Sequence, residues 1–171
     1  MQEQARRDRN TQRLGECFPD FEGRVRMVIA DMESEGFRPR IQDGYRTPAD
    51  QLKAFNNGNS LVKFGFHNVT GEGGKKESLA VDLLDDDHPL ASSRRYVIRL
   101  AAIAERHGLH SGIYFFNSKI SPDKKEVLRA AIRQAVAAQN FDPKIVIGFD
   151  PTHIEATGVT IAQAAAGKRP G

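Results

Sequence analysis

The sequence predicts a single α+β domain in which a small antiparallel sheet packs against helices. Segments with apolar residues at helical spacing are mixed with short apolar runs, without the regular strand–helix–strand order of a parallel sheet. A chain of 171 residues suits one core better than two. An apolar content of 39% and a charged content of 27% are ordinary for a soluble globular domain.

Four helices are expected, each with a recognisable start or stop signal. Two begin with a hydroxyl side chain followed by proline, and the other two end just before a glycine. Their approximate limits are residues 20–35, 47–55, 92–107 and 121–139.

Strands are expected where apolar residues run together or alternate between turn residues. Their approximate limits are residues 38–45, 64–67, 79–84, 109–116, 144–149 and 153–156. The polar residues 1–19 are expected to be a frayed extension with at most a short helix, and residues 161–171 a loose tail. The domain itself would then span residues 20–160.

Charge and composition limit the class of partner. The net charge is +3 and the pI about 9.1, but Lys and Arg are spread along the chain. This favours weak attraction to anionic surfaces and no nucleic-acid partner. The single cysteine, Cys17, excludes a disulfide framework and is expected to be a buried thiol. No apolar run has the length or position of a membrane span or export signal, so we expect cytoplasmic synthesis without membrane insertion.

Three residues form a candidate ligand set: His67, Asp82 and His153, in the segments FGFHN, SLAVDLLDD and FDPTHIEA. Two imidazoles and one carboxylate are sufficient to hold a catalytic Zn²⁺ that keeps its fourth position open for water. Asp82 lies between apolar residues, where a carboxylate needs a partner such as a metal ion. Asp150, three residues before His153, is a candidate general base. A hydrolase is therefore the first interpretation.

Four motifs in this order resemble those of the M15 peptidases, the zinc D-Ala-D-Ala carboxypeptidases and L-alanyl-D-glutamate endopeptidases that include many phage endolysins. They are Tyr45-Arg46-Thr47 with Gln51, Gly65-Phe66-His67 with Ser78-Leu79-Ala80-Val81-Asp82, Gly108-Leu109-His110-Ser111-Gly112, and Asp150-Pro151-Thr152-His153-Ile154-Glu155. The resemblance spans about residues 20–157. It implies a Hedgehog/D,D-peptidase-type zinc fold with zinc ligands at three positions, His67, Asp82 and His153.

The resemblance also implies roles for the residues around the metal. Asp150 would be the catalytic acid and base, and Arg46 a cation that binds substrate or stabilises the oxyanion. Gln51 would bind substrate or support Arg46. Glu155 shares a strand face with His153, so it would either support that ligand or be a solvated strand residue.

Two insertions distinguish the chain from the family pattern. Residues 69–77 lengthen the gap between the first two ligands, and residues 117–142 add a helix before the last motif. We expect these segments either to flank the cleft, as lid or partner-binding elements, or to be neutral additions to the surface.

Other candidates are weaker. His88 is a spare ligand candidate, whereas His107 and His110 flank a helix end, where a structural role is expected. A 2-His-1-carboxylate Fe(II) oxygenase uses the same ligand types, but its first His and carboxylate are normally two residues apart on a barrel. A metal-free module that binds cell-wall peptide or a partner protein is the non-enzymatic alternative. Analysis of the bound metal distinguishes the three hypotheses: zinc indicates the hydrolase, iron the oxygenase, and no metal the binding module.

The predicted function is hydrolysis of an amide bond in the stem peptide of peptidoglycan, with an endopeptidase favoured over a D-Ala-D-Ala carboxypeptidase. Without an export signal, the enzyme would reach the periplasm or cell wall through a holin, as a phage endolysin, or through a secretion system, as an antibacterial effector. We expect a monomer. The sequence leaves open whether an immunity or delivery protein binds this protein.

Overall fold

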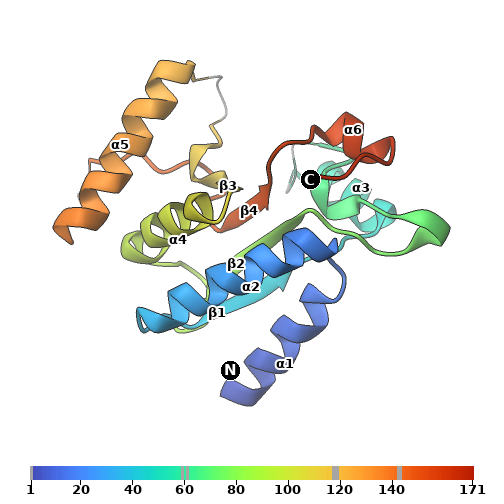
Figure 1. Ribbon diagram of the computed structural model, residues 1–171, viewed down its shortest axis with the longest axis horizontal. Helices are drawn as coiled ribbons and strands as arrows, with labels where there is room; N and C mark the ends of the chain where they lie inside the picture. The colour runs from blue at the N-terminus through green and yellow to red at the C-terminus, as the bar shows by residue number, and fades with distance from the viewer. Residues whose placement is uncertain (1, 59, 61, 117–119, 142–143) are drawn as a thin grey trace.

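The computed structural model describes residues 2–58, 60, 62–116, 120–141 and 144–171 (Figure 1). Within them, helices surround one four-stranded sheet, which confirms the expected α+β class. The strand order is β1-β2-β4-β3, and every neighbouring pair is antiparallel. The strands are β1 (Pro39–Asp43), β2 (Ala80–Asp85), β3 (Leu109–Ser111) and β4 (His153–Ala156).

Two of the expected helices begin where their start signals place them. Thr47 and Ser121 each accept a backbone N–H through the side-chain oxygen and are followed by proline, as predicted, and Ser93 caps a third helix in the same way. The six α-helices of the described residues are α1 (Glu3–Leu14), α2 (Pro19–Ser34), α3 (Pro48–Asn56), α4 (Arg94–Arg106), α5 (Pro122–Ala138) and α6 (Ile161–Ala165).

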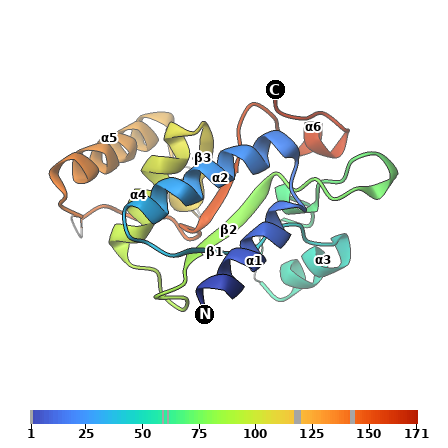
Figure 2. The ribbon, with the colours of Figure 1, turned by 60° about the horizontal axis from the view of Figure 1, so that its bottom comes forward.

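The main core lies between the sheet and the helices α2 and α4. Figure 2 shows α2 lying across the sheet, with α1 beside β1. Phe21, Val25 and Met32 of α2 are buried there, where α2 contacts α4 and β1. A second, smaller apolar cluster joins α4 to α5 through Ile98 and Ile132. Cys17 is buried as expected, and burial raises the pKa of its thiol to about 12.

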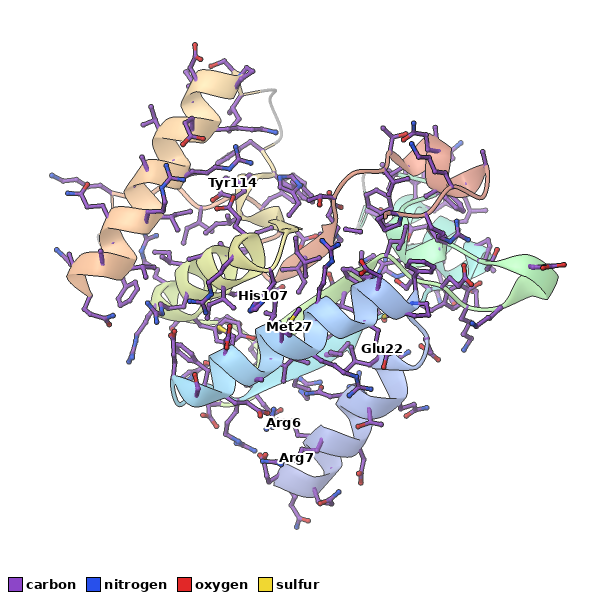
Figure 3. The ribbon with its side chains drawn as sticks, in the orientation of Figure 1. Arg6, Arg7, Glu22, Met27, His107 and Tyr114 are labelled. Carbon is purple, nitrogen blue, oxygen red and sulfur yellow. The ribbon has the colours of Figure 1, made fainter. Side chains whose placement is uncertain are left out.

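Both ends of the chain are more ordered than the sequence suggested. Instead of a frayed segment, α1 packs on β1 through Arg6, which is 1% exposed and donates to the Pro39 carbonyl at 2.6 Å (Figure 3). Instead of a loose tail, residues 161–171 begin with α6, and Arg169 binds Glu77 at 2.8 Å. The buried apolar side chains Leu14 and Ala164 and the polar contacts of Arg6 and Arg169 together anchor the two ends. The domain limits stay a prediction.

Two expected strands are wrong. Phe66–Asn68 form a short 3₁₀ helix, and the described residues 144–149 contain no strand. Residues 144–149 are attached to the turn after β3 by backbone hydrogen bonds instead. Gly148 N–H donates to the Ile113 carbonyl, and Phe149 N–H donates to the Phe115 carbonyl. The strand expected over 109–116 stops at Ser111, because the Ser111 side chain accepts the Ile113 N–H and starts a turn.

The two insertions have different structures. Residues 69–77 form a loop closed by a bridge between Thr70 and Lys76. The described part of residues 117–142 consists mainly of α5, which is tied to α4 by the Arg129–Glu105 ion pair at 2.9 Å. Residues 117–119 and 142 lie outside the described residues. None of the helices that the structure describes is long and apolar enough to cross a membrane.

Candidate metal centre and cleft

The fold brings the three predicted ligands together from separate elements. Asp82 on β2 and His153 on β4 are register partners in the antiparallel sheet. His67 joins them from the short 3₁₀ helix, which is attached to the sheet by the hydrogen bond from Leu79 N–H to the Phe66 carbonyl. Asp82 Oδ1 lies 3.1 Å from His153 Nδ1 and 3.5 Å from His67 Nε2, and these two ring nitrogens are 3.3 Å apart.

Hydrogen bonds on the far side of each ring determine which nitrogen faces the cluster as a ligand. His67 Nδ1 lies 2.6 Å from the Gly44 carbonyl, which can only accept, so Nδ1 carries the proton and Nε2 the lone pair. His153 Nε2 lies 3.1 Å from a Glu155 carboxylate oxygen, so in the neutral ring the lone pair is on Nδ1. Two imidazole nitrogens and one carboxylate oxygen thus converge, which is a donor set that fits zinc.

The electrostatics of the cluster favour a bound cation. Burial opposes the charge of Asp82, yet His67 and His153 hold the pKa of its carboxyl well below the ordinary value. Burial also opposes the charge of His153, but hydrogen bonds to Asp82 and Glu155 outweigh it and raise its pKa to about 10. The two carboxylates therefore hold a proton on His153. A divalent cation would supply this positive charge in place of the proton.

The cluster opens onto a cleft of about 640 Å³. The walls combine polar groups near the cluster with apolar side chains, and Phe149 is 50% exposed there. The lining residues outside the cluster are Arg46, Gln51, Gly58, Ser60, Val62, Gly65, Phe66, Phe115, Phe149, Asp150, Glu155 and Ile161. No described residue of the insertions 69–77 and 117–142 is among them, so the described parts of both do not line the cleft.

Asp150 lies at the edge of the cluster. Its Oδ2 is 3.9 Å from His153 Nδ1, and its side chain is 43% exposed to the cleft. Partial burial and the nearby Asp82 carboxylate raise the pKa of Asp150 above its ordinary value. A carboxyl group in this position can both accept and return a proton.

Arg46 is held by partners on three of its five N–H groups. Nε and Nη2 donate to one oxygen of Asp43, and Nη1 donates to Gln51 Oε1 at 2.9 Å. Nη2 also lies 3.8 Å from Asp82. Gln51 is 2% exposed, and its amide donates to Ser60 and to the Val62 carbonyl, so its contacts fit the support of Arg46 better than substrate binding.

Sequence reasoning missed several partners of the cluster. The Gly44 carbonyl orients His67, but it is a backbone group and no residue type in the sequence indicates it. Asp43 pairs with Arg46 three residues later, and this acidic neighbour could have been recognised in the sequence. A structural role was expected for His110, but its partner Glu155, 3.1 Å from Nδ1, was not foreseen. His107 does have the expected structural role, because it pairs with Asp31 at 2.6 Å. His88 is outside the metal-binding group found among the described residues.

Comparison with solved structures identifies the fold. No family model and no curated protein matches the chain. The crystal structure of the Serratia marcescens L-Ala D-Glu endopeptidase ChiX matches with a TM-score of 0.53 at 14% identity, over 87% of this chain and 86% of that chain. A crystal structure of the D,D-pentapeptidase VanY from a VanB-type resistance cassette, a variant in complex with Zn(II), matches with a TM-score of 0.45 at 16% identity, over 88% and 76%. This chain therefore has the fold of a solved L-Ala D-Glu endopeptidase, which confirms the fold that the resemblance to the M15 peptidases predicted.

Proposed function

We propose that this protein is a zinc peptidase of the M15 type that hydrolyses an amide bond in the stem peptide of peptidoglycan. The observation that carries the proposal is the convergence of His67 Nε2, Asp82 Oδ1 and His153 Nδ1 at the floor of an open cleft. The fold shared with a protein described as an L-Ala D-Glu endopeptidase supports the substrate class.

The residues beside the cluster have complementary roles in amide hydrolysis. Zinc, when bound by the three ligands, supplies Lewis-acid chemistry and acidifies water. The Asp150 carboxylate takes a proton from the attacking water and returns it to the nitrogen of the leaving amine. Its Oδ2 lies 3.9 Å from His153 Nδ1 and its side chain is 43% exposed, so the carboxylate faces both the cluster and the cleft.

Arg46 stabilises the negative charge that develops on the carbonyl oxygen. Asp43 and Gln51 fix its guanidinium, so two N–H groups remain for substrate in an arrangement that needs little reorganisation. A fixed donor of this kind is worth about 3 kcal/mol of transition-state stabilisation.

The charges in the cleft favour an endopeptidase over a D-Ala-D-Ala carboxypeptidase. A carboxypeptidase must bind the terminal carboxylate of its substrate. Arg46 is the one Lys or Arg side chain among the described lining residues, and Asp43 and Asp82 already balance its charge. With Asp150 and Glu155, four carboxylates outweigh the charges of Arg46 and a bound Zn²⁺, which would oppose a substrate carboxylate.

Digestion of purified sacculi and of defined stem peptides, with products identified by mass, tests the proposal. Paired peptides with a free or an amidated C-terminus should be cut at the same internal bond at similar rates. Asp150→Ala is expected to retain zinc and lose cleavage, whereas His153→Ala should lose both. Preferential release of terminal D-Ala would favour the carboxypeptidase, and a zinc-loaded protein that yields no products would favour the binding module.

We also propose that the enzyme acts in the periplasm or cell wall as a phage endolysin or an antibacterial effector. Export to the periplasm of a Gram-negative host should cause lysis that cytoplasmic expression does not, with His153→Ala as the control. Equal lysis by wild type and His153→Ala would contradict this proposal. The holin or secretion system, the immunity or delivery protein and the monomeric state stay predictions.

A further inference from the structure

A chain of hydrogen bonds leads from the metal cluster to His110. His153 uses Nε2 to bind one oxygen of Glu155 at 3.1 Å. The other oxygen of Glu155 lies 3.1 Å from His110 Nδ1. The order His153–Glu155–His110 therefore joins a proposed metal ligand to a side chain outside the residues that line the cleft.

The register of the sheet builds this chain into the fold. His153 and Glu155 are two residues apart on β4, so their side chains share one face of the sheet. His110 on β3 is the register partner of Glu155 in the antiparallel β3–β4 pair. Directly opposed residues of such a pair bring their side chains within reach of each other.

Aromatic side chains hold the His110 ring in place. Tyr114 stacks on it with a centroid distance of 6.0 Å and an interplanar angle of 7°. Phe115 meets it edge-on at 5.5 Å and lies at the same distance from the His153 ring. Tyr114 itself is fixed between α4 and α5, where Arg129 lies 5.0 Å from its ring (Figure 3). The ring of His110 is thus an anchored donor.

We propose that His110 is a positioning residue for the metal centre: acting through Glu155, it fixes the His153 ring with Nδ1 toward His67 and Asp82. A carboxylate bound only by His153 can rotate about its own side-chain bonds, and the ring can turn with it. A carboxylate bound by both histidines cannot. Groups that orient a metal-binding histidine in this way typically contribute 10–100-fold to metal affinity. This inference rests on the proposed metal site.

His110→Phe tests the proposal, because it keeps an aromatic ring beside Tyr114 but removes the donor to Glu155. Zinc affinity, measured by competition with a chelating dye, is expected to fall by about 10–100-fold. His110→Asn restores a donor near the Nδ1 position and should bind zinc within about threefold of wild type. His107→Phe removes a histidine that pairs with Asp31 away from the cluster, and it should leave zinc affinity unchanged. The absorption bands of bound Co²⁺ should change in His110→Phe but not in His110→Asn or His107→Phe.

A double-mutant cycle separates positioning from loss of folding. Because His110 acts through Glu155, His110→Phe should cause no further loss of zinc affinity in a Glu155→Ala background. Additive losses, or wild-type affinity and Co²⁺ spectrum in His110→Phe, would overturn the positioning role while leaving the proposed function intact. A wild-type protein that binds no zinc would overturn both. Melting temperatures with excess chelator show that each variant is folded.

Discussion

Replacing Gly112 by alanine tests how the fold positions the segment that carries Asp150 and His153. Gly112 closes the Gly-Leu-x-x-Gly motif and has no room for a side chain. A Cβ atom there would lie 2.1 Å from the Asp150 carbonyl oxygen and 3.0 Å from His153 Cβ, whereas ordinary contact begins at 3.4 Å. The Asp150 backbone would therefore have to move by about 1.3 Å relative to Gly112.

A displacement of this size is large for a catalytic group. A misplacement of about 1 Å can reduce a rate by about 10²-fold, so kcat/KM on a stem peptide is expected to fall to about one hundredth, or by about 2.7 kcal/mol. Overpacking should also destabilise the fold by about 1–3 kcal/mol, which lowers the melting temperature. Zinc affinity should fall as well, because His153 belongs to the displaced segment.

Gly23→Ala is the matched control for Gly112→Ala. Gly23 lies inside α2, and a Cβ there would meet nothing within 4 Å. Alanine should stabilise this helix by up to about 1 kcal/mol and leave kcat/KM unchanged. Wild-type kcat/KM and melting temperature in Gly112→Ala would refute the reasoning about the close approach.

Three further predictions concern charge and metal. Arg46→Lys keeps the charge but loses the fork that binds Asp43 and Gln51, so kcat/KM should fall by about 10²–10³-fold while zinc content, measured by atomic emission, stays unchanged. Hydrogen bonds from Arg6 lower the pKa of Glu3 to about 2, so Glu3 stabilises the fold above pH 4.5 and this contribution is lost as the pH falls toward 2. Glu3→Gln should therefore lower the melting temperature, followed by circular dichroism, at pH 7 but not at pH 2; an equal loss at both would contradict the ion pair. Free zinc at 1,000 times its Kd should stabilise the fold by about 4 kcal/mol, seen as a rise in melting temperature that a chelator reverses.

The sequence predicts best those elements whose signals are local. Thr47 and Ser121 are followed by prolines, and each starts a helix where expected, because the cap and the fixed proline dihedral act within one turn. The runs 64–67 and 144–149 are apolar but form no strand. Strand formation depends on a partner distant in sequence, and an apolar run does not specify one.

In the candidate site, too, the sequence predicts the residues but not the long-range contacts that orient them. The order of the motifs identified His67, Asp82 and His153 as one group, and the structure brings them together. Their orientation depends on contacts that no motif contains. The Gly44 carbonyl is a backbone group, and the Glu155–His110 contact exists only through the register of β3 on β4.

The central claim is that a metal ion at His67, Asp82 and His153 enables cleavage of the stem peptide. The most direct measurement is the mass of the peptides released from sacculi by metal-stripped protein, before and after addition of one equivalent of zinc. The stripped protein should release nothing, and zinc should restore cleavage in wild type but not in His153→Ala. Undiminished cleavage by the stripped protein would contradict the claim.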